Sequence, residues 1–168
     1  MSRLDSFIRR LCAQRACLDA AAAAIAAVPG PVLEVGLGNG RTFDHLRSLL
    51  PDRSIFVFDQ RMAAHPDCVP DADRLVLGDI RDTLPVAAAT VGAPVALLHS
   101  DIGSGDSAAN ERIAAFLSGV LPLLMAEGGV ILSDQRLDMA GWSLLPLPAD
   151  VRPGRYFFYG RTPTETVR

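Results

Sequence analysis

Apolar side chains recur with two different periods along the chain. Within residues 1–28 they recur at helical spacing, which predicts a leading amphipathic helix. Beyond it, short apolar runs predict strands at residues 32–35, 55–58, 75–77, 95–98 and 130–132. Helical patterns at residues 43–50, 83–90 and 108–125, or looping segments, separate these strands. Strands joined by such crossovers form a parallel sheet that helices cover on both faces.

The pattern changes near the end of the chain. Residues 142–147 and 156–161 are typical of strands, and only the segment PADVRPG lies between them. We therefore expect an antiparallel hairpin at the sheet edge. The expected fold class is α/β: a doubly wound seven-stranded sheet, mostly parallel, with one antiparallel strand of the C-terminal hairpin inserted near the edge. A length of 168 residues suits one domain with its core at residues 31–161.

Composition and charge narrow the possible partners. The formal net charge of −3 gives no basic footprint, so we expect neither nucleic acid nor an anionic membrane as a partner. All 16 basic side chains are arginine, which excludes lysine as a base or a Schiff-base former. The three cysteines form no CxxC motif, so we expect reduced thiols and a cytoplasmic location.

Three glycines follow the first predicted strand at every second position. In open parallel sheets, ligands lie beyond the carboxyl ends of the strands, where Gly36, Gly38 and Gly40 are expected. The dinucleotide fingerprint GxGxxG is absent, because Arg41 stands where its third glycine would be. This weakens an oxidoreductase interpretation that uses NAD. A tight turn without a ligand is the alternative to a binding loop.

Acidic residues end the next two predicted strands. The carboxylate of Asp59 can accept both hydrogen bonds of a ribose diol. Asp79 and Ile80 end the run LVLGDI. A lone aspartate at a strand end is usually a helix cap. An ordered series of such positions is more specific than any one of them.

The stretch ExGxGxG at residues 34–40, with FD at 58–59 and GDI at 78–80, resembles the motifs of class I S-adenosylmethionine-dependent methyltransferases. The resemblance extends from residue 31 to about residue 160. It implies a Rossmann-like fold and S-adenosyl-L-methionine as cofactor. No substrate-recognition insertion is apparent in the sequence, so we expect a small-molecule acceptor that the leading helix and the loop after the second strand cover, or else an acceptor that another subunit covers. The resemblance also implies that Glu34 lies beneath the methionine portion, that Asp79 bonds the adenine amino group and that Ile80 packs on the ring. The implied cofactor-binding residues are Glu34, Gly36, Gly38, Asn39, Gly40, Asp59, Gln60, Asp79, Ile80 and Ser100.

In this family the loop after the fourth strand faces the transferred methyl group. The catalytic candidates there are Asp101, as general base for O-methylation, and His99. In cation-dependent O-methyltransferases this loop resembles DxD, and the fifth strand ends in DD or DN. The matching residues here are His99, Asp101, Asp134 and Gln135. A histidine and an amide leave little charge for a hard cation, so a divalent metal is possible but a metal-free site is favoured. The structural alternative is that both aspartates cap turns and that a backbone hydrogen bond holds His99.

Two further alternatives stay open at this point. A module that binds the cofactor without catalysis would also explain the incomplete acidic set. Arg9, Arg10 and Arg15 of the leading helix most simply form a solvated face, and a salt bridge to an acidic acceptor is the alternative. The apolar leading helix and the segments WSLLPLP and RYFFYG predict a homodimer or larger assembly.

Overall fold

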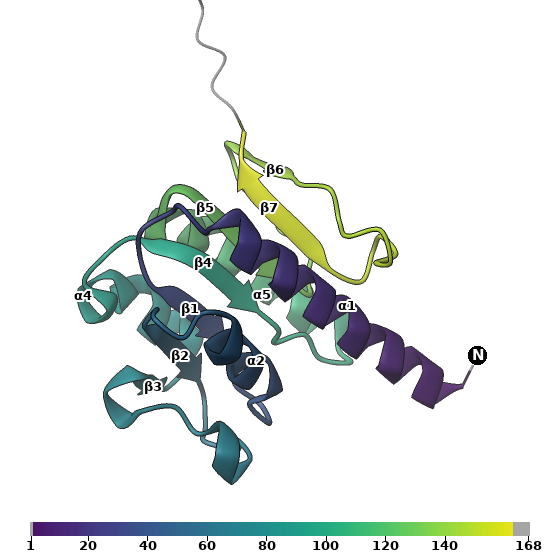
Figure 1. Ribbon diagram of the computed structural model, residues 1–168, viewed down its shortest axis with the longest axis horizontal. Coiled ribbons are helices and arrows are strands. Elements are labelled where there is room, and N and C mark those ends of the chain that lie inside the picture. Colours follow the sequence, from purple (N-terminus) through teal and green to yellow (C-terminus); the bar gives the residue numbers. More distant parts are fainter. Residues whose placement is uncertain (1, 163–168) are drawn as a thin grey trace, which may run out of the picture.

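A seven-stranded sheet with the order β3-β2-β1-β4-β5-β7-β6 forms the centre of the protein in a computed structural model, which describes residues 2–162 (Figure 1). The strands are β1 (Val32–Val35), β2 (Ile55–Asp59), β3 (Leu75–Leu77), β4 (Val95–Ser100), β5 (Met125–Ser133), β6 (Trp142–Leu144) and β7 (Phe157–Arg161). Strands β1 to β5 pair in parallel, and β7 lies antiparallel between β5 and β6. The predicted fold, with its inserted antiparallel strand, is confirmed.

Helices cover both faces of this sheet. The α-helices are α1 (Arg3–Ala24), α2 (Arg41–Leu49), α3 (Ile80–Thr83), α4 (Ala87–Val91) and α5 (Ser107–Leu124). Short 3-10 turns are η1 (Pro66–Cys68), η2 (Ala72–Arg74) and η3 (Leu84–Val86). None of the helices within residues 2–162 is both long enough and apolar enough to cross a membrane.

Neighbouring residues of one strand supply the two cores. On β4, Leu97 packs with Leu18 of α1 and Leu46 of α2. The next residue, Leu98, packs with Leu117 of α5 on the opposite face. This alternation is the period of a strand, and it places α1 across the front of the sheet and α5 behind it (Figure 1).

Two predicted elements differ in the structure. The expected continuous helix at residues 83–90 is wrong, because α3, η3 and α4 divide that segment. Pro85 lies in η3 and has no N–H to donate to a continuing helix. The expected strand at residues 142–147 ends at Leu144, two residues before Pro146. A proline removes a donor from the ladder in the same way.

The amino-terminal half of α1 extends beyond the sheet (Figure 1). Ser2 and Asp5 cap this helix reciprocally, each side chain accepting from the backbone N–H of the other. On the extending half, Leu4 is 65%, Phe7 47% and Ile8 49% exposed. The leading helix is therefore confirmed, and its first turns present an apolar surface to solvent.

Arg53, in the turn before β2, fastens the link between α1 and β1. Its Nη1 donates to the carbonyls of Val28 (2.7 Å) and Gly30 (2.9 Å), and its Nη2 donates to that of Ile25 (2.7 Å). The side chain is half-buried, so these charge-assisted bonds are partly shielded from water. These three hydrogen bonds hold the segment between α1 and β1 against the turn that precedes β2.

We expect Arg53→Met to lower the free energy of unfolding by about 2 to 3 kcal/mol, because three carbonyls lose a charged donor. Urea denaturation measures the change. Arg112→Met is the matched control on the exposed side of α5, and a change within about 0.5 kcal/mol is expected there. Equal stability of the two variants would show that the hydrogen bonds of Arg53 contribute nothing to the free energy of unfolding.

Candidate functional site

A cleft of about 530 Å³ opens at the carboxyl edge of the sheet, where β1, β2, β3 and β4 end. Backbone and side chains from four successive turns line it. The sequence-predicted residues that it brings together are Gly36, Gly38, Asp59, Gln60, Asp79, Ile80 and Asp101. This is the ligand position expected for an open parallel sheet.

The three glycines of the loop have different reasons to be glycine. All have positive φ, but a Cβ at Gly36 would come within 2.9 Å of the Asp101 carbonyl, and one at Gly40 would meet Cys68. Both glycines therefore allow close approach of other protein segments. A Cβ at Gly38 would meet no protein atom within 4 Å, so Gly38 is the position at which the loop is open toward a ligand.

Asp59 holds the glycine loop from the end of β2. Its Oδ2 accepts from the backbone N–H groups of Leu37 (2.7 Å) and Gly38 (3.1 Å), and its Oδ1 accepts from that of Arg61 (3.1 Å). A carboxylate offers about four acceptor positions. Asp59 thus retains capacity for a hydroxyl group in the cleft.

Asp79 caps α3 and pairs with a neighbouring arginine. It accepts from the backbone N–H of Arg81 (2.9 Å) and from its guanidinium, and these hydrogen bonds lower the pKa of the carboxyl group to about 2. The helix-cap interpretation therefore applies to Asp79, even though the residue also lines the cleft. The adjacent Ile80 lines the cleft and is 6% exposed.

Glu34 and His99 lie beneath the cleft rather than in it. They are paired neighbours on β1 and β4, and both are completely buried. His99 Nδ1 and Glu34 Oε2 are 2.6 Å apart, and the other Glu34 oxygen accepts from the Thr42 hydroxyl. Burial lowers the pKa of His99, but the Glu34 carboxylate raises it, and the net direction is upward. Side chains, not a backbone carbonyl, thus hold His99.

The polar chain continues from His99 to the edge of the cleft. His99 Nε2 bonds the hydroxyl of Tyr156, which lies next to Gln14 of α1 (3.4 Å). Gln14 Nε2 also donates to Asp101, whose two oxygens accept from Arg10 Nη2 at 2.6 and 2.7 Å. Burial, followed by the charge of Asp101, raises the pKa of Tyr156 well above its usual value. We call Glu34, His99, Tyr156 and Gln14 the buried network, which ends at the partly exposed Asp101.

Sequence reasoning missed two members of the buried network. Tyr156 was expected only as a strand residue, and Gln14 had no motif around it. Their partners are 57 positions away for the Tyr156–His99 bond and 87 for the Gln14–Asp101 bond. Only the helical phase of Gln14, close to buried Cys17 and Leu18, indicates that its side chain faces the protein.

The candidate metal residues His99, Asp101 and Asp134 form no complete ligand set within residues 2–162. Both ring nitrogens of His99 bond Glu34 and Tyr156, and no group of three histidine, cysteine or acidic side chains within residues 2–162 is placed to hold a metal. Asp134 accepts from the Gly103 N–H (2.8 Å). Burial, followed by the charge of Asp101, raises the pKa of Asp134 to about 6.

Some predicted residues lie outside the cleft. Ser100 is completely buried, and its hydroxyl has no hydrogen-bond partner within the described residues. The side-chain amide of Gln135 is also buried and also has no partner among them. Gly40 forms the N-cap of α2. Asn39 instead lines an adjoining hollow, which is described next.

A hollow of about 240 Å³ adjoins the cleft under the amino-terminal half of α1. Phe7, Arg10 and Leu11 form one side, and the glycine loop with Asn39 forms the other. The hollow and the cleft share Gly36, Gly38 and Asp101. We call it the α1 hollow; Asp101 stands at its boundary with the cleft.

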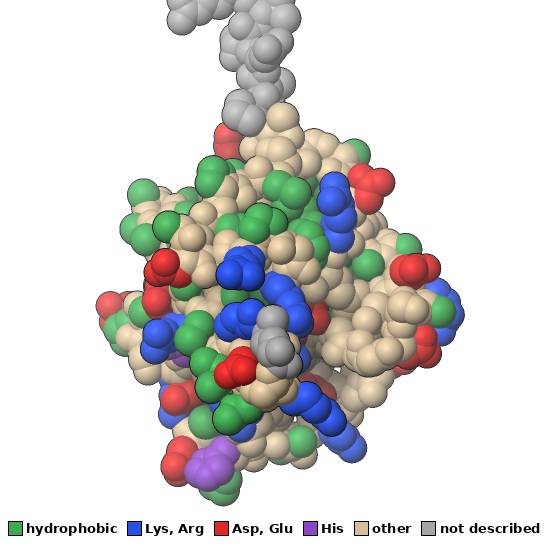
Figure 2. Space-filling model, turned by 90° about the vertical axis from the view of Figure 1, so that its right-hand side faces the viewer, with side chains coloured by type: hydrophobic (Ala, Val, Ile, Leu, Met, Phe, Trp, Pro, Cys, Tyr) green, Lys and Arg blue, Asp and Glu red, His purple; other side chains and the backbone are tan. Residues whose placement is uncertain are grey.

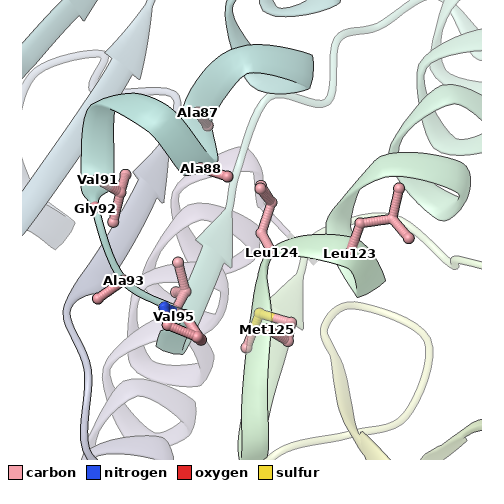
Figure 3. A pocket seen from close by; sticks show the side chains of 10 residues that line it. Ala87, Ala88, Val91, Gly92, Ala93, Val95, Leu123, Leu124 and Met125 are labelled. Atoms are coloured by element: carbon pink, nitrogen blue, oxygen red, sulfur yellow. The ribbon is translucent and has the colours of Figure 1, made fainter.

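Figure 3 shows a different hollow, between α4 and the end of α5. Its lining is apolar and includes Val91, Leu123, Leu124 and Met125, and none of the described residues that line it is titratable. It adjoins the start of β4, at the edge of the sheet opposite Asp101. It therefore adds no candidate chemistry.

Comparisons with known proteins match this architecture. A family model described as S-adenosyl-L-methionine methyltransferase matches residues 1–161. The crystal structure of an S-adenosyl-L-methionine methyl transferase from Silicibacter pomeroyi DSS-3 is 44% identical and superposes with a TM-score of 0.90, over 96% of this chain and 99% of that chain. No curated protein matches the sequence significantly.

Two more distant structures share the fold alone. CalS11, a TDP-rhamnose 3'-O-methyltransferase of calicheamicin biosynthesis, is 21% identical with a TM-score of 0.60, over 86% of this chain and 76% of that chain. The sugar N-methyltransferase KedS8 from Streptoalloteichus sp. ATCC 53650 is 18% identical with a TM-score of 0.50, over 86% and 61%.

The nicotinamide-dependent alternative has no support from these matches, and the glycine loop lacks the spacing that it requires. The family match covers nearly the whole chain, and the 44% identity extends along almost all of the Silicibacter protein. This chain therefore belongs to the S-adenosyl-L-methionine-dependent methyltransferases.

Proposed function

We propose that this methyltransferase methylates a hydroxyl group of a small acceptor, with Asp101 as the general base. The observation that carries the proposal is the place of Asp101 at the boundary between the cleft and the α1 hollow. A cofactor in the cleft and an acceptor in the α1 hollow would meet at this carboxylate. In the transfer, the methyl–sulfur bond breaks with its electron pair left on sulfur, a carbon–oxygen bond forms, and Asp101 takes the hydroxyl proton.

The residues of the cleft fit S-adenosyl-L-methionine, which supplies an activated methyl group when bound. Asp59 has acceptor capacity for ribose hydroxyls, and the open side of Gly38 allows backbone approach. Ile80 offers an apolar surface for a base, and Asp79 an acceptor for its amino group. Gln60 adds a polar side chain at the same edge. The cleft of about 530 Å³ is within the range of small-ligand sites.

Glu34 has a different place in this proposal from its neighbours in the motif. Both of its oxygens are bonded, to His99 and to Thr42 at the start of α2. We infer that it supports the glycine loop from below through Thr42. Gly40 also supports the loop rather than a ligand, because its lack of a Cβ lets Cys68 of η1 pack against the loop.

Asp101 is oriented for proton transfer by its neighbours. Gln14 and Arg10 bond its oxygens from α1, which fixes the carboxylate at the mouth of the α1 hollow. Because both nitrogens of His99 are bonded below, this residue is a positioning residue that acts through Tyr156. Because its two ring nitrogens are already bonded, His99 has no nitrogen left for a metal ion, so we favour proton transfer without a metal. A cytoplasmic location stays a prediction that rests on the free cysteines.

We also infer a homodimer or larger assembly in which α1 takes part. The exposed apolar side chains Leu4 and Ile8 lie one helical turn apart on the extending half of α1. Phe7 and Leu11 of the same helix border the α1 hollow. An assembly through α1 would therefore also shield the proposed acceptor position.

Asp59→Ala is expected to weaken binding of S-adenosyl-L-methionine by about 1.5 to 3 kcal/mol, since it removes a charged acceptor. Titration calorimetry measures the affinity. Asp59→Asn keeps an oxygen for the loop amides and should lie between wild type and Asp59→Ala. Asp52→Ala, an exposed residue in the turn that precedes β2 at the opposite edge, is the control and should bind as wild type does. Wild-type affinity in Asp59→Ala would refute the assignment.

Asp101→Asn is expected to lower turnover by about 100-fold to 10,000-fold, the usual contribution of a general base, while cofactor affinity stays within about twofold. The acceptor is first found by screening for formation of S-adenosylhomocysteine. Excess EDTA should leave the wild-type rate unchanged, and Asp52→Asn is the control variant. Strict dependence on added magnesium or manganese would contradict the metal-free mechanism.

Sedimentation velocity at micromolar concentration should show a dimer or larger species. The double variant Leu4→Glu/Ile8→Glu should shift it to monomer, because charged side chains at a buried apolar contact are costly. Leu123→Glu, at an 80% exposed position on α5, is the control and should leave the assembly intact. A monomeric wild-type protein would rule out the assembly.

A further inference from the structure

Four arginine side chains converge on one pocket beside the α1 hollow. Arg9 and Arg10 come from α1, and Arg152 and Arg155 from the segment that precedes β7. The pocket has a volume of about 300 Å³, and we call it the arginine pocket. Figure 2, which faces the amino-terminal end of α1, shows basic side chains gathered on this side of the protein.

Three of the four arginines of the pocket have no ion-pair partner within residues 2–162, whereas Arg10 pairs with Asp101. Among the residues that the structure describes, Asp150 is the one acidic residue that lines it. Arg9 donates to a backbone carbonyl (3.3 Å) and Arg155 to the Ser6 hydroxyl (3.4 Å). Within residues 2–162, no carboxylate lies within ion-pair distance of Arg9, Arg152 or Arg155. This concentration of positive charge occurs in a chain whose net charge is −3.

Arg10 connects the arginine pocket with the proposed acceptor position. It lines both the arginine pocket and the α1 hollow, and its Nη2 bonds both oxygens of Asp101 at 2.6 and 2.7 Å. A guanidinium carries five N–H donors on three nitrogens, so Nε and Nη1 of Arg10 remain available to a second anion. The pair with Asp101 raises the pKa of Arg10, which keeps its charge in place.

We propose that the arginine pocket binds an anionic group, a carboxylate or a phosphate, of the methyl acceptor. The inference rests on the proposed function, because it needs the acceptor in the α1 hollow. An acceptor whose hydroxyl lies at Asp101 would extend past Arg10, and its anionic group would lie among Arg9, Arg152 and Arg155. Planar guanidinium groups bind carboxylate and phosphate oxygens in pairs, which gives orientation as well as affinity. The substrate class is therefore a small acid that carries a hydroxyl group.

Anion binding can be tested without turnover. Inorganic phosphate and acetate are titrated separately into the ¹⁵N-labelled protein at constant ionic strength, and amide and arginine Nε–H shifts are followed by NMR. At least one of the two anions should cause saturable shifts confined to the arginine pocket. The dissociation constant should rise at least fivefold in Arg152→Gln and in Arg155→Gln. It should not change in Arg112→Gln, the exposed control on α5. The anion that binds more tightly identifies the group.

Two results of the titration would overturn the proposal. One is the absence of saturable shifts with both anions. The other is equal weakening in Arg112→Gln, which would indicate a general charge effect. S-Adenosyl-L-methionine affinity should be the same in all three variants, because none of the residues lines the cleft. A variant that loses cofactor affinity together with anion affinity would also contradict a separate arginine pocket.

The acceptor screen supplies the second test. Pairs of hydroxylated compounds that differ only in a carboxylate against a carboxamide are compared by formation of S-adenosylhomocysteine. We expect the acids to react, with KM for the acid raised about 10-fold to 100-fold and kcat unchanged in Arg155→Gln. Methylation of neutral compounds alone would overturn the anionic acceptor and leave the proposed O-methylation standing. Saturable phosphate or acetate binding without methylation of any hydroxyl compound would overturn the proposed O-methylation and leave the anion site standing.

Discussion

The buried contact between Glu34 and His99 is the constraint on which the site depends. A carboxylate that is removed from water is costly unless other groups bond its oxygens, and Glu34 meets this need with His99 and Thr42. Each partner belongs to a different element, so β4 and the start of α2 are tied to β1. Tyr156 extends the same chain of bonds toward α1. The position of the proposed base is therefore set in part by side chains buried beneath the cleft, through Tyr156 and Gln14.

The fold could be predicted from the sequence because local patterns of apolar residues determine where its strands and helices lie. The alternation of apolar strands with helices is visible in any short window, and Asp59 and Asp79 follow directly from where the strands end. The buried network is different. Gln14 and Tyr156 are in contact although 142 positions separate them in the chain, so no local pattern can relate them. His99 resembles a ligand in a motif, and only its two partners show that it faces inward.

The glycine loop shows that a sequence motif predicts where a loop lies more reliably than it predicts which groups each of its residues contacts. Sequence spacing indicates that Gly36, Gly38 and Gly40 form one turn, and they do. Two of them are glycines because another protein segment approaches, and only Gly38 is open on its outer side. Helix-cap and ligand interpretations of Asp79 were offered as alternatives, yet the carboxylate can serve both, since a capping oxygen at a strand end also borders the cleft.

The inserted strand β7 has a consequence for how the protein is made. Tyr156 directly precedes β7 and lies 57 residues after His99, so a ribosome finishes β1 to β6 before it supplies the partner of His99. Among the strands of residues 2–162, β7 alone pairs with both β5 and β6, so β6 has no partner strand before β7 is made. Tyr156 is therefore the member of the buried network that a ribosome adds last, after Glu34, His99 and Gln14 are already in the chain.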